Sequence, residues 1–238
     1  MRIAFDIYIP ISPIVILLVL AVVANFVLAW RVWVSNRKHL VNIYYALAIL
    51  SAAFWTIGII FFWLAKSASL ISLSLRWNHF WAALIIFFFY FFTYYFPYKT
   101  FILKKSYAVI ILVATFFILV ISVLPNLFIP SVVALAEKFK APSNLFWHIV
   151  YGIYFLGMGI VSFRNLLAKY RRTDGIWRKR LKQVLIATSI TYIGGSIFDL
   201  IIPIVYNDIL GWVGPLFTLF MAAYIGYYIF WEPNRVVN

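Results

Sequence analysis

Seven apolar stretches of about twenty residues recur along the chain, and they leave few folds open to it. A helix of about twenty residues is long enough to cross the hydrocarbon core of a bilayer. The stretches cover residues 11–33, 40–65, 75–96, 106–125, 144–166, 183–206 and 211–231. Because every backbone polar group in lipid must be hydrogen-bonded within the protein, we expect an all-α bundle of seven transmembrane helices, forming one domain over residues 1–238.

The charge content agrees with a polytopic membrane protein. Charged residues make up only 11% of the 238 residues, about half the share of a typical soluble domain. The net charge of +14 would favour nucleic acid in a soluble protein, whereas here it indicates basic loops beside anionic lipid. We therefore expect a lipid bilayer as partner and no nucleic acid. The first stretch is longer than the apolar core of a signal peptide, so we expect it to be retained.

Lys and Arg residues predict the orientation. If the N-terminus is outside, fifteen of the 20 Lys and Arg fall on the inner side and five on the outer side. The positive-inside rule then predicts a multi-pass protein of the cytoplasmic membrane, with the N-terminus out and the C-terminus in. A basic run between the fifth and sixth stretches is either an anchor to anionic lipid or a docking surface for an acidic partner. Its members are Arg171, Arg172, Arg178, Lys179 and Arg180.

The connections carry their own predictions. Residues 66–74 (KSASLISLS) form either a polar join or the helical start of the third span, and residues 131–139 (SVVALAEKF) suit a short interfacial helix. The fifth and sixth spans are expected to extend toward each other and to meet at residues 173–175. Pro203 and Pro215 predict kinks near the outer ends of the last two spans.

The sequence lacks the residues that known membrane enzymes need. A retinal protein requires a mid-membrane Lys, and an aspartyl protease requires two embedded Asp residues where only Asp199 qualifies. A zinc protease requires HExxH-like spacing, but the three His residues are isolated, and Cys is absent. We expect no enzyme, no cofactor and no metal site, with His79 and His148 as haem ligands the less frequent alternative.

Four polar side chains are predicted to meet in a pocket near the outer side: Arg76, His79, His148 and Asp199. Asp199 lies seven residues before the outer end of its span, roughly 10 Å deep at 1.5 Å per residue. His79 lies about 5 Å deeper than Arg76 by the same rise. The candidate pocket aromatics are Trp77, Trp81, Trp147 and Trp212. The alternative is that Arg76 extends to lipid headgroups within a belt of interfacial aromatics.

Small residues accompany the polar ones. Gly194 and Gly195 precede Asp199, and three further glycines lie in the fifth span at Gly152, Gly157 and Gly159. Small residues in membrane helices most often allow close helix packing, and we expect that use here.

Two segments have a more specific pattern. Residues 36–63 (NRKHLVNIYYALAILSAAFWTIGIIFFW) begin with a basic loop containing Asn and continue into a helix with Trp55 and Gly58 near its centre. Residues 74–97 open with an Arg and end in a Phe-Pro pair. In both respects the chain resembles the seven-transmembrane region at the N-terminus of many bacterial sensor histidine kinases.

The last two spans extend the resemblance over nearly the whole chain. Residues 178–205 join basic and Gln residues to a Gly-Gly stretch, a polar residue and a Pro, and the final span opens with Gly214-Pro215. The chain departs from the family at Asp199, where a neutral amide is expected. No phosphotransfer helix and no ATP-binding fold follow Trp231, so the resemblance does not imply kinase activity.

The resemblance implies a sensor module of two-component signal transduction. It would sense a ligand, a peptide or a membrane signal at the outer side and act on a histidine kinase or other signalling protein on a separate chain. Two alternatives remain open: a small transporter or channel subunit that uses Asp199 as a proton or cation site, and a membrane scaffold without a ligand.

Overall fold

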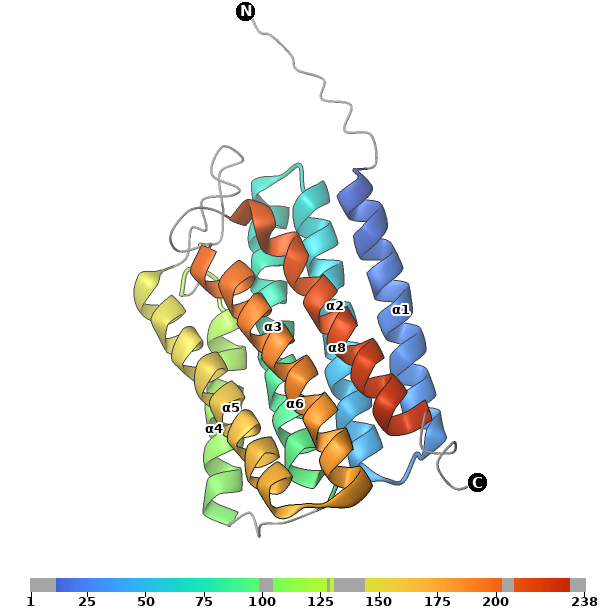
Figure 1. Ribbon diagram of the computed structural model, residues 1–238. Helices are drawn as coiled ribbons and strands as arrows, with labels where there is room; N and C mark the ends of the chain where they lie inside the picture. The colour runs from blue at the N-terminus through green and yellow to red at the C-terminus, as the bar shows by residue number, and fades with distance from the viewer. Residues whose placement is uncertain (1–11, 99–104, 128, 131–143, 203–207, 232–238) are drawn as a thin grey trace, which may run out of the picture.

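Seven helices long and apolar enough to cross a membrane form the described part of the chain, which confirms the expected all-α bundle. The computed structural model describes residues 12–98, 105–127, 129–130, 144–202 and 208–231. The helices pack side by side and alternate in direction, so α1 begins at one end of the bundle and the last helix finishes at the other (Figure 1).

The helices have the following bounds: α1 Pro13–Ser35, α2 Leu40–Leu64, α3 Ala68–Tyr95, α4 Lys105–Val123, α5 Leu145–Arg172 and α6 Gly175–Ser196. A π-helical turn, η2 (Ile197–Ile201), continues α6. The last span consists of the 3-10 turn η3 (Asp208–Val213), the helix α8 (Gly214–Gly226) and a second π-helical turn, η4 (Tyr227–Trp231).

Two ends of the bundle are distinguished below. The basic end is the one where α5 stops at Arg172 and α6 starts at Gly175. The Asp199 end is the opposite one, where α6 passes into η2 and α8 begins. Gly175 has a φ of +65°, a left-handed conformation that favours glycine, and this residue turns the chain from α5 into α6.

Several helix boundaries in the structure can be compared with those expected from the sequence. The serine-rich join belongs to α3, because the Ser67 side chain caps the helix by accepting a hydrogen bond from the Leu70 N–H at 3.4 Å. The fifth and sixth spans do extend toward each other and meet at residues 173–175. Pro215 lies in the first turn of α8, directly after the 3-10 turn η3, so it stands where one helix type changes into the other. Pro203 and the helix expected over residues 131–139 lie outside the described residues.

An aromatic core fills the half of the bundle nearer the basic end. The Tyr45 ring lies 4.8 Å from the Phe92 ring and 5.5 Å from the Phe230 ring, and Phe92 stacks on Phe96 at 5.2 Å. The Tyr45 hydroxyl donates to the carbonyl oxygen of Met221 at 3.1 Å. Because Tyr45, Phe92 and Phe96 are buried, this core closes the middle of the bundle between α2, α3 and the last span.

Candidate functional site

A cavity of about 150 Å³ lies between five of the seven described spans, and no residue of α1 or α4 lines it. Its lining extends from Asp199 and Trp212 near the Asp199 end to Phe89 and Phe163 deeper in the bundle. Most lining side chains are apolar or aromatic, with a few polar groups among them, which is the usual make-up of a small-molecule site. The polar members are Asn78, His79, Tyr151, Thr188, Thr191, Tyr192, Ser196, Asp199 and Thr218.

Asp199 reaches the cavity from the π-helical turn η2. Single π-helical turns within α-helices occur frequently at functional sites. The carboxylate lies directly against Gly214, where a Cβ atom would overlap its oxygens, and a Cβ on Gly195 would be 3.7 Å from Oδ2. Gly214 is the first residue of α8 and follows the 3-10 turn η3 directly, so the carboxylate lies beside the junction of these two helical segments.

The two predicted histidines lie next to each other beside the cavity. The His79 ring centroid is 6.3 Å from that of His148 and 5.1 Å from that of Tyr151. His79 Nδ1 is 2.8 Å from the Leu75 carbonyl oxygen, and because a carbonyl only accepts, Nδ1 carries the hydrogen. The Tyr151 hydroxyl donates to the His79 carbonyl at 2.9 Å. His79 and Tyr151 line the cavity, and His148 lies behind them, only 5% exposed.

Arg76 is directed away from the cavity, toward α4. Its Nη1 donates to the carbonyl oxygen of Val123 at 3.3 Å, and its Nε donates to that of Ser72 at 3.4 Å. Val123 is the last residue of α4, so the guanidinium stabilises the C-terminus of that helix, where cations are favoured. The structure therefore places Asp199 and His79 in the lining of one cavity, with His148 beside His79, and leaves Arg76 outside that lining.

Of the four predicted aromatics, one lines the cavity and three lie outside its lining. Trp212 lines the cavity. Trp77 is 36% exposed and donates from Nε1 to the Phe54 carbonyl at 2.7 Å, and Trp81 stacks on the Phe54 ring at 4.5 Å. Trp147 packs against Phe117 of α4 at 6.1 Å. The other large aromatics of the lining, absent from the predicted set, are Trp55, Phe62, Trp63, Phe89, Tyr151, Phe155, Phe163 and Tyr192.

Three buried polar atoms of the lining make no hydrogen bond to any described residue: Asn78 Oδ1, Thr188 Oγ1 and Ser196 Oγ. Buried polar groups in proteins are nearly always paired with protein, water or ligand. A cavity of about 150 Å³ holds several waters or a molecule of about the size of benzene. The unpaired groups are therefore candidates for contact with such an occupant.

Lys169 lies on the far side of the cavity floor and is fully buried. Its ammonium donates to three carbonyl oxygens at the end of α3, those of Thr93 (2.9 Å), Tyr94 (2.7 Å) and Phe96 (2.7 Å). The last carbonyls of a helix have no partner within it, and a cation there also complements the helix dipole. In the sequence this residue counts among the basic residues of the inner side, where burial is not expected. Two turns or so of α5 separate it from Phe163 in the lining.

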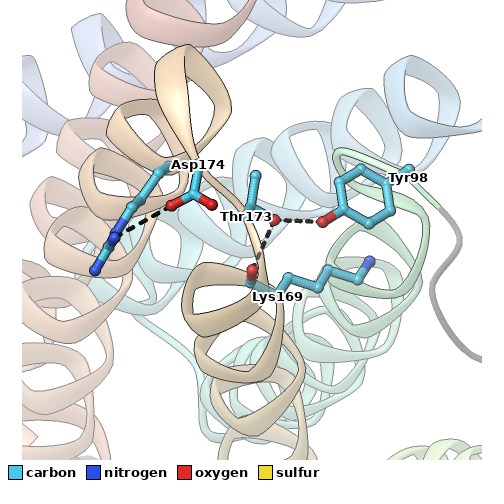
Figure 2. Close-up of polar contacts among 5 residues, drawn as sticks. Tyr98, Lys169, Thr173 and Asp174 are labelled. Atoms are coloured by element: carbon cyan, nitrogen blue, oxygen red, sulfur yellow. Dashed lines mark hydrogen bonds and ion pairs between the residues drawn. The ribbon is translucent and has the colours of Figure 1, made fainter.

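The turn between α5 and α6 is tied to the segment after α3 (Figure 2). The Tyr98 and Thr173 hydroxyls are hydrogen-bonded, and Thr173 Oγ1 donates to the Lys169 carbonyl at 2.8 Å. In the first turn of α6, Arg178 Nη1 lies 3.4 Å from the Asp174 carboxylate. These contacts join the ends of three helices at the basic end.

The predicted basic surface lies at the same end. Arg171, Arg172, Arg178 and Lys179 are exposed, and Arg180 is half-buried with its guanidinium 4.8 Å from the Trp177 ring centroid. The arrangement provides a charged surface around the turn.

Comparison of the chain with models of known protein families and with curated proteins finds no match in either case. The described residues contain no group of three or more His, Cys, Asp or Glu side chains that could hold a metal ion. The chain is a polytopic membrane protein, and its described residues form seven candidate spans around a cavity that Asp199 and His79 line.

Proposed function

We propose that the protein is a membrane sensor, in which a small ligand enters the cavity from the Asp199 end and its binding alters the basic end. In the N-out orientation that the sequence predicts, the Asp199 end lies outside and the basic end faces the cytoplasm. The observation that carries the proposal is the course of the cavity. Its lining begins at Asp199 and ends at residues such as Phe89 and Phe163, above the buried aromatic core.

Two helices, α5 and α6, connect the cavity with the basic end, and this connection supports a sensing function. Tyr151, Phe155 and Phe163 of α5 line the cavity, and so do Thr188 and Ser196 of α6. The same two helices form the turn at residues 173–175 that carries the basic surface. Because packed helices shift as rigid units, a displacement at the cavity moves this turn. A ligand drives such a shift only if it binds the two arrangements with different affinity.

A separate signalling protein would then read the basic end. The exposed basic side chains around the α5–α6 turn suit an acidic surface on a kinase or another signalling protein. The proposal assigns binding to this chain and catalysis to the partner. The residue pattern that resembles the membrane region of sensor kinases supports the same assignment.

Transport is the second candidate, because an ionisable residue within a membrane span often marks an ion path and Asp199 lines the cavity. Transport requires that the cavity be reached from both ends of the bundle, at least in alternation. Sensing requires access from the Asp199 end alone. The two functions therefore differ in which side of the membrane reaches the cavity floor.

A cysteine-accessibility experiment separates them, and the chain suits it because it has no Cys of its own. Thr188→Cys introduces a thiol at the cavity floor, and a small membrane-impermeant methanethiosulfonate is applied to each side of oriented vesicles in turn. Lys179→Cys is the matched control, because its thiol is exposed at the basic end and reacts from that side only. Sensing predicts reaction of the Thr188→Cys thiol from the Asp199 side alone. Reaction from both sides supports transport, and reaction from neither overturns both proposals.

A further inference from the structure

We propose that the cavity binds a small uncharged molecule that has an apolar ring in its middle and a hydrogen-bonding group at each end. This inference rests on the proposed sensor function and adds the chemical class of the ligand. Two unpaired hydroxyl groups of α6, the aromatic walls of the cavity and the charge of its lining support it.

The two hydroxyl groups belong to Thr188 and Ser196. Both residues line the cavity, and both hydroxyl oxygens are buried without a hydrogen bond to any described residue. The Thr188 side chain is the more enclosed, since the residue is only 5% exposed. A buried hydroxyl without a partner is costly, and such groups nearly always pair with protein, water or ligand. A ligand therefore gains hydrogen bonds here that the protein does not supply to itself.

Neighbouring hydroxyl groups of the same lining are already paired within the protein. Thr191, one helical turn after Thr188, donates from Oγ1 to the Phe217 carbonyl oxygen at 2.9 Å. Thr218 donates from Oγ1 to the Pro215 carbonyl oxygen, also at 2.9 Å. The free hydrogen-bonding capacity of the cavity hydroxyls thus lies at Thr188 and at Ser196, and it is not spread over the whole lining.

The spacing of the two unpaired hydroxyls sets the length of the ligand. Ser196 follows Thr188 by eight residues within α6, which corresponds to about 12 Å along the helix axis. Thr191, Tyr192 and Gly195 also line the cavity, so the cavity follows α6 over this length. A benzene ring with a polar group at each end, and a hydrogen bond of about 2.8 Å on either side, covers roughly that distance. A hydroxyl on the ligand suits both ends, because hydroxyls donate and accept.

The wall between the two hydroxyls suits an aromatic ring. Trp55, Trp63 and Phe155 are among the aromatic side chains of the lining. Aromatic rings attract one another in offset-stacked and edge-to-face arrangements beyond the effect of apolar burial. A cavity of about 150 Å³ matches one that holds benzene, so one ring with short substituents is the size expected of the occupant.

The charge of the lining favours a neutral ligand. Neither Lys nor Arg occurs among the described residues that line the cavity. The acid of the lining, Asp199, already takes part in an interaction within the chain, so we do not assign it to the ligand as a counter-ion. Burial of a charge without a dedicated counter-charge is costly, whereas an uncharged hydroxyl needs only a hydrogen-bond partner.

A set of probes built on one ring tests the inference. We compare 4-hydroxybenzyl alcohol, which has a hydroxyl at each end, with benzyl alcohol, which has one. The charged analogues are 4-hydroxybenzylammonium and 4-hydroxybenzoate. Each is titrated into the protein in lipid nanodiscs at pH 7 by equilibrium dialysis, with empty nanodiscs as blank. We expect 4-hydroxybenzyl alcohol to bind about fivefold more tightly than benzyl alcohol, as for one added hydrogen bond, and at least about tenfold more tightly than either charged analogue.

Three variants locate the two ends of the ligand. Thr188→Val keeps the shape of the side chain and removes its unpaired hydroxyl, and Ser196→Ala removes the other one. Each is expected to weaken 4-hydroxybenzyl alcohol about fivefold. Thr218→Val is the matched control, because it removes a hydroxyl of the same lining that is already paired with Pro215, and it is expected to leave the affinity unchanged within about twofold.

The inference is overturned if either charged analogue binds as tightly as 4-hydroxybenzyl alcohol, or if the second hydroxyl brings no gain over benzyl alcohol. It is equally overturned if none of the probes binds up to about 10 mM, or if Thr188→Val and Ser196→Ala bind like the parent. If one of these two variants does not fold, the other and the probe series decide. The sensor proposal fails separately, by reaction of the Thr188→Cys thiol from the basic side, so the two failures are distinguishable.

Discussion

Lys169 and Asp199 are both charged groups within the spans, and the structure gives them different partners. Lys169 satisfies three carbonyl oxygens at the end of α3 and is fully buried. Asp199 faces a cavity and the start of α8. Burial of a charge is costly unless its hydrogen bonds are made, so the Lys169 ammonium is structural, whereas the Asp199 carboxylate belongs to the cavity lining.

Loss of the Lys169 ammonium is therefore expected to destabilise the bundle. Lys169→Met keeps the length of the side chain and leaves the carbonyls of Thr93, Tyr94 and Phe96 without their donor. We expect the free energy of unfolding to fall by about 3 kcal/mol, the range for removing one partner of a buried charged hydrogen-bond group. Reversible unfolding in mixed detergent micelles measures it. Lys179→Met, at an exposed position, is the control and is expected to change stability by less than about 0.5 kcal/mol.

Arg76 provides a test of the cavity boundary at the same scale. Its guanidinium donates to Val123 at the end of α4 and does not line the cavity. Arg76→Met is expected to cost about 1 kcal/mol of stability, the usual value of a cation at a helix C-terminus. It is expected to leave the rate at which a methanethiosulfonate modifies the Thr188→Cys thiol unchanged within about twofold. A large change of that rate would place Arg76 at the cavity and contradict this assignment.

At the scale of elements, the glycines of α5 differ in whether they pack closely against another helix. A Cβ on Gly159 would overlap the Tyr192 ring of α6, whereas Gly152 and Gly157 have no atom within 4 Å of such a Cβ. The expectation of close packing thus holds for Gly159 and not for the other two. Tyr192 approaches Gly159 closely and donates its hydroxyl to the Leu156 carbonyl at 2.8 Å, which fixes α6 against α5.

Alanine substitutions in α5 are expected to separate these glycines. Gly152→Ala and Gly157→Ala reduce the flexibility of the unfolded chain without a clash and are expected to stabilise the protein by about 0.5 kcal/mol each. Gly159→Ala pushes the Tyr192 ring away and is expected to cost about 1–3 kcal/mol. The three variants are compared by the same unfolding measurement in micelles. Equal effects at all three positions would contradict the packing described for Gly159.

At the scale of the whole molecule, the cavity and the basic end share α5 and α6. Bulk inside the cavity is therefore expected to move the turn between these helices relative to α2. Ala82 of α3 lines the cavity, and Ala82→Phe places a ring there in the manner of a bound ligand. Spin labels at Arg37→Cys and Lys179→Cys, both exposed at the basic end, report the distance between the start of α2 and the start of α6.

We expect Ala82→Phe to shift the mean distance between the labels by about 1–2 Å, the size of helix displacements in known switches. Double electron–electron resonance in nanodiscs measures the shift. Gly152→Phe adds the same ring where a Cβ meets open space, and it is expected to leave the distance unchanged. If both variants give the same distances as the parent, the cavity and the basic end are not coupled and the sensor proposal loses its mechanism.

The amino-acid sequence by itself determined the number of spans, their approximate bounds and the all-α class. Lipid imposes these features locally, because each span must be about twenty residues long and must hydrogen-bond its own backbone. The sequence also placed Asp199 and the two histidines at similar depth, since depth follows from position along a helix. The serine-rich start of α3 and the short turn between α5 and α6 are likewise determined by residues that are close together in the sequence.

Only the tertiary structure decided which side of each helix faces inward. In a soluble helix the apolar face identifies the core, but a membrane helix is apolar all round, so this signal is lost. Trp55 and Trp77 look alike in the sequence, yet the first lines the cavity and the second is exposed. The same holds for the burial of Lys169 and for the contact between Asp199 and Gly214, because each depends on residues far apart in the chain that meet only when the helices pack.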